Sequence, residues 1–232
     1  MSYESSLSRM DGRTPKAGML QDCLFQRTLL IKPLCRPFRR KENPMTGNRT
    51  LLKREDCLLV MIDVQEKLFP AVHERDKVKA NLIRLVKFSR VVDLPVMVTE
   101  QENLGATLPE ISREIPEFNP VRKITFDCFA CPAFQSLVKR SGKPALVVAG
   151  LESHICVAQT ALSGLKNHRV QVVTDAVSSR SVHNRETAIQ RLSMAGVELT
   201  TTEMFLYEIL QQAGTEAFRA VLPLVKDDSK LP

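Results

Sequence analysis

The chain has 232 residues, of which 44% are hydrophobic and 25% charged, a composition typical of a globular protein. This length fits one α/β domain with an appendage, and no apolar run approaches the ~20 residues that a membrane-spanning helix needs. The formal net charge of +7 lies almost wholly in residues 1–50, where ten Lys and Arg residues face four Asp and Glu residues. The other residues hold 23 Lys and Arg against 22 Asp and Glu, a net charge of only +1, so the sequence predicts neither nucleic acid nor membrane as a partner.

Residues 1–50 show neither a helical nor a strand period and mix Ser, Pro, Gly and Arg, with a basic cluster over residues 36–41. Three interpretations stay open: a disordered basic tail, an Arg-rich organelle-targeting segment, or an upstream extension of a chain that begins near Met45. The four acidic residues argue against targeting. We therefore expect a poorly ordered N-terminal extension with no part in catalysis, a folded domain over residues 51–226 and a short tail over residues 227–232.

The six cysteines favour reduced thiols over disulfides. Cys57 and Cys156 fall in or beside predicted buried elements, and no secretory signal with a cleavable apolar core opens the chain. We therefore expect a cytoplasmic location, with an organelle as the alternative if the basic extension is a targeting segment. Cys128 and Cys131 form a Cys-x-x-Cys pair, but the second pair or the His pair that a zinc site needs is missing. Packing is the default interpretation of this pair, and we expect no metal and no cofactor.

From residue 52 onward, apolar runs of strand length alternate with amphipathic helical segments. Strands are predicted at residues 57–62, 95–98, 121–124, 145–149, 170–173 and 197–200. Helices are predicted at residues 75–92, 132–141, 154–165, 184–195, 202–212 and 215–225. This order, with short connections, predicts about six mainly parallel strands covered by helices on both faces, a three-layer α/β/α, Rossmann-like fold. No Gly-x-Gly-x-x-Gly or Walker-type loop occurs, which argues against a nucleotide site.

Cys156 stands out because of its place between a predicted strand and a predicted helix. The strand ends at Gly150, Ser153 is a good helix N-cap, and Cys156 then falls in the first helical turn. The unpaired backbone N–H groups and the positive end of the helix dipole favour thiolate over thiol there. Ligands also bind at the carboxyl ends of strands in open α/β sheets. A nucleophile is the functional interpretation, and a small buried core residue is the structural one.

Asp63 and Lys123 also follow or end predicted strands, so they share an edge of a parallel sheet with Cys156. Asp63 could then take the thiol proton as general base and return it to the leaving group. Lys123 could keep the carboxylate charged and stabilise the thiolate. Backbone N–H groups of the turn before Cys156 could form an oxyanion hole. Asp63 is equally a possible helix N-cap, and spacing alone leaves both alternatives open.

The chain from about Leu52 to Leu224 resembles the isochorismatase-like cysteine hydrolases, the superfamily that includes nicotinamidases and N-carbamoylsarcosine amidases. The matching segments come in the family's order and at about its spacing: residues 62–65, 123–129, 150–157 and 160–161. Two further segments, residues 99–101 and 173–180, resemble the small single-domain isochorismatase-domain proteins.

The resemblance implies an isochorismatase fold and a catalytic triad of Asp63, Lys123 and Cys156. It also implies a cis peptide bond between Leu151 and Glu152, with the backbone amides of Glu152 and Cys156 as the oxyanion hole. The implied reaction is hydrolysis of a small amide-type C–N bond, or of a related acyl compound, through a thioester acyl-enzyme. A non-catalytic or regulatory interaction protein that keeps the hydrolase fold is the alternative. Related proteins are mostly dimers or larger assemblies, so a homo-oligomer is expected.

Several residues of this sequence differ from the patterns of particular family members, and these differences narrow the reactions that the resemblance implies. Metal-dependent nicotinamidases carry an Asp-x-His pair and a further His between the Asp and Lys positions, whereas residues 99–119 contain no His. Isochorismatase proper cleaves a vinyl ether and typically lacks the cysteine, so Cys156 points to amide or related acyl chemistry. His154 stands where the nicotinamidase-like pattern often has Asp. We therefore expect a metal-independent enzyme.

Five residues near the predicted sheet edge are candidates for binding a small-molecule substrate, each with a structural alternative. Gln65 more readily satisfies backbone near the first loop, and Glu100 and Gln101 either line the cleft or hold loop backbone. Phe126 and Phe129 either wall an apolar pocket or pack in the core.

Overall fold

Six parallel strands form the centre of the part of the chain that the computed structural model describes, residues 50–226. The sheet order is β3-β2-β1-β4-β5-β6, and every neighbouring pair is parallel. This confirms the predicted fold class. The predicted N-terminal extension and C-terminal tail lie outside the described residues, apart from Thr50. The strands are Cys57–Ile62 (β1), Val96–Gln101 (β2), Val121–Lys123 (β3), Ala145–Leu151 (β4), Arg169–Ser178 (β5) and Glu198–Thr200 (β6).

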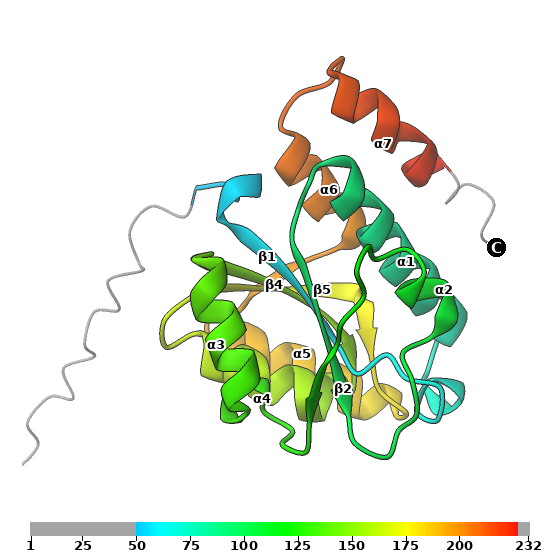
Figure 1. The fold of residues 1–232 in the computed structure, drawn as a ribbon, viewed down its shortest axis with the longest axis vertical. Coiled ribbons are helices and arrows are strands. Elements are labelled where there is room, and N and C mark those ends of the chain that lie inside the picture. Colours follow the sequence, from blue (N-terminus) through cyan, green and yellow to red (C-terminus); the bar gives the residue numbers. More distant parts are fainter. Residues whose placement is uncertain (1–49, 227–232) are drawn as a thin grey trace, which may run out of the picture. The chain divides into compact units, whose positions relative to one another are not determined.

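Helices cover both faces of the sheet (Figure 1). Helices α1, α6 and α7 pack on one face, and α3, α4 and α5 pack on the other. Within the described residues the helices are Arg75–Val91 (α1), Pro109–Ser112 (α2), Pro132–Ser141 (α3), Ala158–Gly164 (α4), Val182–Met194 (α5), Thr202–Leu210 (α6) and Glu216–Lys226 (α7). Two short turns complete the site region, the 3₁₀ turn Cys128–Ala130 (η3) and the π-helical turn Ser153–Val157 (η4). No helix within residues 50–226 is long and apolar enough to span a membrane.

Strand β1 reads as an unbroken apolar run because helices bury both of its faces. Its alternate side chains Cys57, Leu59 and Met61 join the core layer under α1, α6 and α7. Leu58, Val60 and Ile62 join the other layer, under α3, α4 and α5. All six are at most 2% exposed. The polar residues that follow β1 therefore start at the edge of a fully covered sheet.

Gly150 allows β1 and β4 to come close together at the carboxyl edge. It pairs with Ile62 and has φ +120°, a conformation that residues with a Cβ rarely adopt. A Cβ added at Gly150 would lie only 2.1 Å from the Ile62 carbonyl oxygen. The glycine therefore sets the separation between the Asp63 segment and the turn that carries Cys156.

Several predicted boundaries differ from the structure. The second strand runs on to Gln101 instead of ending at Val98, since residues 99–101 pair with residues 121–123 of β3. The fifth strand extends to Ser178, and α2 forms inside a stretch predicted as loop. Helix α5 begins at Val182, so Ser181 is its N-cap and Asn184 is not; the Ser181 hydroxyl accepts the Asn184 backbone N–H at 3.4 Å.

Candidate active site

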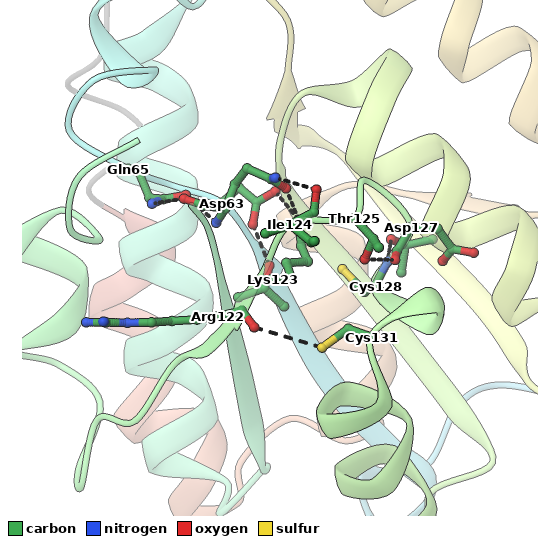
Figure 2. A network of polar contacts seen from close by, with 12 residues as sticks. Asp63, Gln65, Arg122, Lys123, Ile124, Thr125, Asp127, Cys128 and Cys131 are labelled. Atoms are coloured by element: carbon green, nitrogen blue, oxygen red, sulfur yellow. Dashed lines mark hydrogen bonds and ion pairs between the residues drawn. The ribbon is translucent and has the colours of Figure 1, made fainter. Parts of the chain in front are cut away.

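Asp63 and Lys123 form a buried ion pair at the carboxyl edge of the sheet (Figure 2). Asp63 directly follows β1 with φ +52°, and Lys123 ends β3, with β2 between them. Lys123 Nζ lies 2.6 Å from Asp63 Oδ2, and the two side chains are 0% and 1% exposed. Burial, the largest single influence, would lower the pKa of Lys123, but the Asp63 charge, the Asp63 hydrogen bond and the neighbouring Cys128 and Cys156 together outweigh it, and the pKa is raised. Lys123 is therefore cationic at neutral pH, and Asp63 acts as its counter-ion and not as a helix N-cap.

Cys156 lies in the η4 turn at the start of the helical segment that continues into α4. Its thiol lies close to the Asp63 carboxylate and the Lys123 ammonium. Burial and the negative charge of Asp63 raise the pKa of the Cys156 thiol, and the charge of Lys123 offsets this only in part. The expectation that the helix start favours a resting thiolate is therefore wrong. At neutral pH Cys156 is a thiol beside the Asp63 carboxylate.

Thr99 and Gln101 hold the ion pair from β2, and the role of Thr99 was not predicted. The Thr99 hydroxyl donates to Asp63 Oδ1 at 2.7 Å, and Lys123 Nζ donates to Gln101 Oε1 at 2.9 Å. Gln101 Nε2 in turn donates to the Ile124 carbonyl at 2.8 Å. Extending the second strand by three residues would have placed both side chains beside the pair, because Thr99 is opposite Ile62 in the β1–β2 register.

Gln65 and Glu100 use their side chains to hold backbone and loop groups. Gln65 Nε2 donates to the carbonyls of Gln101 and Gly105, and its Oε1 accepts the Gln101 N–H. Glu100 Oε1 accepts both the backbone N–H and the hydroxyl of Thr107 at 2.9 Å. The contacts match the structural alternative for each residue. They shape the loop beside the site from its outer side.

The two aromatic candidates, Phe126 and Phe129, lie in different environments. Phe129 packs its ring against Phe134 at 5.2 Å and against His168 at 5.8 Å between centroids, which is the core-packing alternative. Phe126 follows Lys123 by three residues and is 52% exposed. Of the two rings, Phe126 is therefore the one that offers apolar surface near the carboxyl edge.

The turn before Cys156 is built around Glu152. The peptide bond between Leu151 and Glu152 is cis, as the family resemblance implied. The Glu152 carbonyl accepts the N–H groups of Ile155 and Val157, which closes the π-helical turn. Its buried carboxylate binds the Nε of Arg180, a residue of the loop after β5.

Ser153 and His154 follow Glu152 in the turn, and Ser153 differs from the sequence prediction. Ser153 occupies the first position of η4 and is not its N-cap, and its buried hydroxyl has no hydrogen-bond partner. His154 points its Nδ1 at the Ser179 hydroxyl, 2.9 Å away, and lies 3.3 Å from Glu152 Oε2. The Glu152 side chain thus connects the turn that carries Cys156 to the segment that follows β5.

The two cysteines of the Cys-x-x-Cys pair face different groups. Cys128 is fully buried, and burial raises the pKa of its thiol to about 11 even though Lys123 lies near. Cys131 directs its sulfur to the Arg122 carbonyl at 3.9 Å (Figure 2). Within residues 50–226, no three His, Cys, Asp or Glu side chains gather as metal ligands would.

The sequence profile of the Isochorismatase domain matches residues 57–204, which include the ion pair, Thr99 and Cys156. The chain belongs to the isochorismatase family. Among curated members, isochorismatase domain-containing protein 2 of Danio rerio is 35% identical over 182 residues, which cover 77% of this chain and 91% of that protein.

Two solved structures share the fold of this isochorismatase-family member, and their functional descriptions differ from each other. One, described as the MAR1 ribonuclease of Caenorhabditis elegans, aligns with a TM-score of 0.71 at 29% identity, covering 75% of this chain and 92% of the other. The YcaC gene product of Escherichia coli, described as an octameric hydrolase of unknown specificity, aligns with a TM-score of 0.72 at 26% identity, covering 79% and 96%. These likenesses bear out the family and its fold; they assign no substrate to this chain.

Proposed function

We propose that this isochorismatase-family protein is a metal-independent cysteine hydrolase that cleaves a small amide-type C–N bond, or a related acyl compound. Asp63, Lys123 and Cys156 are its catalytic residues. One observation carries the proposal: a buried ion pair, 2.6 Å from Lys123 Nζ to Asp63 Oδ2, lies beside a thiol at a helix start and acts on the pKa of that thiol. A carboxylate, a cation and a thiol are expensive to bury together unless they act on one another.

In the first half of the reaction, Asp63 takes the Cys156 proton as the sulfur attacks the carbonyl carbon. The raised pKa of the thiol makes this coupling necessary, because little thiolate forms beforehand at neutral pH. Lys123 stays charged throughout and offsets the negative charge that moves from Asp63 to sulfur. Collapse of the tetrahedral intermediate breaks the C–N bond, and Asp63 returns the proton to the leaving nitrogen.

The second half releases the acyl group. Asp63, ionised again, takes a proton from water, whose oxygen attacks the thioester carbon. The C–S bond breaks, the proton returns to the Cys156 sulfur and a carboxylic acid leaves. In both halves the backbone N–H groups of Glu152 and Cys156 are our proposed donors to the oxyanion, and losing such a donor typically slows a reaction by ~10²–10³.

We propose further that the enzyme works as a homo-oligomer. The YcaC hydrolase of Escherichia coli is described as an octamer. In the present chain, Ile124 and Phe126 are 69% and 52% exposed directly after the triad lysine, and large apolar side chains gathered beside a site favour a protein contact. Measurement of the molar mass in solution for the wild type and for an Ile124→Ser, Phe126→Ser double variant tests this.

A panel of small amides and esters, assayed with the wild type and with Cys156→Ala, tests the proposed hydrolase. We expect turnover of at least one compound class by the wild type, a mass increase from an acyl group on Cys156, and neither in the variant. Asp63→Asn should trap little acyl-enzyme because it cannot take the thiol proton. If iodoacetamide labels Cys156 of Asp63→Asn as fast as it labels the wild type, the general-base mechanism is wrong, and the interaction-protein alternative gains support.

A further inference from the structure

Thr99 lies on β2, between the strands that carry the base and the cation of the proposed triad. Its hydroxyl donates to Asp63 Oδ1 at 2.7 Å, and its carbonyl accepts the Asp63 backbone N–H at 3.1 Å. We propose that Thr99 is a positioning residue of the reaction, whose hydroxyl fixes the Asp63 carboxylate as the acceptor of the Cys156 proton. The inference rests on the proposed function and adds a residue to it.

The contacts of Asp63 explain why one hydroxyl has this effect. Lys123 occupies Oδ2 and Thr99 occupies Oδ1, so each carboxylate oxygen has a fixed donor and the plane of the group cannot rotate freely. The lone pairs that remain on these oxygens are free to take the Cys156 proton in the proposed reaction. Without Thr99, one oxygen would lose its donor inside a buried site.

Thr99 also lies in a polar cluster that reaches the helix carrying the nucleophile. The Cys128 thiol lies near the hydroxyls of Thr99 and Thr160, and the Cys128 N–H donates to Thr160 Oγ1 at 3.0 Å. Thr160 lies about one helical turn after Cys156. These side chains are at most 1% exposed, so a buried polar cluster extends from Asp63 to α4.

Shape alone does not call for a hydroxyl at position 99. Val matches Thr in shape and is at least as common on buried strand positions, so sheet packing would be satisfied by either residue. A buried hydroxyl is costly unless it has partners, and the partners of this one are the proposed general base and a thiol of the same cluster. The presence of a hydroxyl at position 99 is therefore explained by its polar partners in the proposed site and not by packing within the sheet.

The test is the rate at which iodoacetamide alkylates Cys156 in the full-length protein, read at the Cys156 peptide by mass spectrometry at neutral pH. We expect Asp63→Asn to lower this rate, because it removes the proposed acceptor of the thiol proton. Thr99→Val should lower the rate about tenfold, the size expected for loss of one hydrogen bond to a charged group. Thr99→Ser keeps the hydroxyl and should retain the wild-type rate.

Thr174→Val is the matched control, because the Thr174 hydroxyl, on β5, donates to the backbone carbonyl of Thr200, on β6. It should leave the alkylation rate unchanged. The inference is overturned if a folded Thr99→Val, or Thr99→Ala should the first variant not fold, keeps the wild-type rate, or if Thr99→Ser lowers it equally. If Asp63→Asn is alkylated as fast as the wild type, the proposed function has failed, and the inference fails with it.

Discussion

The Asp63–Lys123 pair gives the clearest stability prediction at the scale of single residues. Both side chains are almost wholly buried, so removing one partner leaves a buried and uncompensated charge. We expect Lys123→Met to lower the free energy of unfolding by about 3–5 kcal/mol. Lys123→Met combined with Asp63→Asn should recover much of that loss because it removes both charges. Urea unfolding of both variants measures the difference, and a double variant as unstable as the single one would contradict it.

Ser153 tests two interpretations of one residue against each other. As an N-cap, its replacement by Ala would destabilise the domain by about 1 kcal/mol. In the structure the Ser153 hydroxyl is buried and has no hydrogen-bond partner, so Ser153→Ala removes an unsatisfied polar group. We therefore expect the variant to be as stable as the wild type or more stable. A thermal melt decides the sign, and Ser181→Ala, which removes the hydroxyl that caps α5, is the destabilising comparison.

At the scale of elements, the contact of β1 with β4 depends on Gly150. A methyl group at this position would overlap the Ile62 backbone, and φ +120° is unfavourable for Ala. Because the clash is with backbone, it cannot be relieved by a side-chain rotation. We expect Gly150→Ala to unfold at clearly lower denaturant concentration and to lose Cys156 labelling by iodoacetamide. Gly142→Ala is the control, since it also has positive φ but meets no atom within 4 Å.

The sequence predicts the strands and their order better than it predicts the end of β2 or the protonation state of the thiol. The apolar runs of β1 and β4 predict strands and their order, because strands covered on both faces leave that pattern. The last three residues of β2 are polar, so no apolar pattern marks them as strand. Thr99 and Glu100 are nevertheless buried, since Asp63 and Thr107 satisfy their side chains. The family resemblance named Asp63, Lys123 and Cys156, but the state of the thiol depends on packing. The helix start acts against burial and the Asp63 charge, and only the structure shows that burial and charge outweigh it.

At the scale of the whole molecule, buried thiols make the domain sensitive to alkaline pH. Burial raises the pKa of Cys57 from 9.0 to about 12 and that of Cys128 to about 11, and it raises the pKa of Cys156 as well. Unfolded thiols lose their protons at lower pH than folded ones do, so the stability of the native state is fully present below about pH 9 and falls above it. Each thiol contributes a slope of at most about 1.4 kcal/mol per pH unit.

Urea unfolding of the full chain across this pH range, under reducing conditions, measures the alkaline loss. We expect stability to be level near neutral pH and to decline steeply between pH 9.0 and about pH 12, the ordinary and the raised pKa of Cys57. Cys57→Ala should make this decline shallower, because it removes a fully buried thiol from the opposite face of the sheet without touching the triad. Cys131→Ala removes a thiol that is only half-buried, and should leave the slope nearly unchanged. Equal slopes in the wild type and Cys57→Ala would show that groups other than the buried thiols control alkaline unfolding.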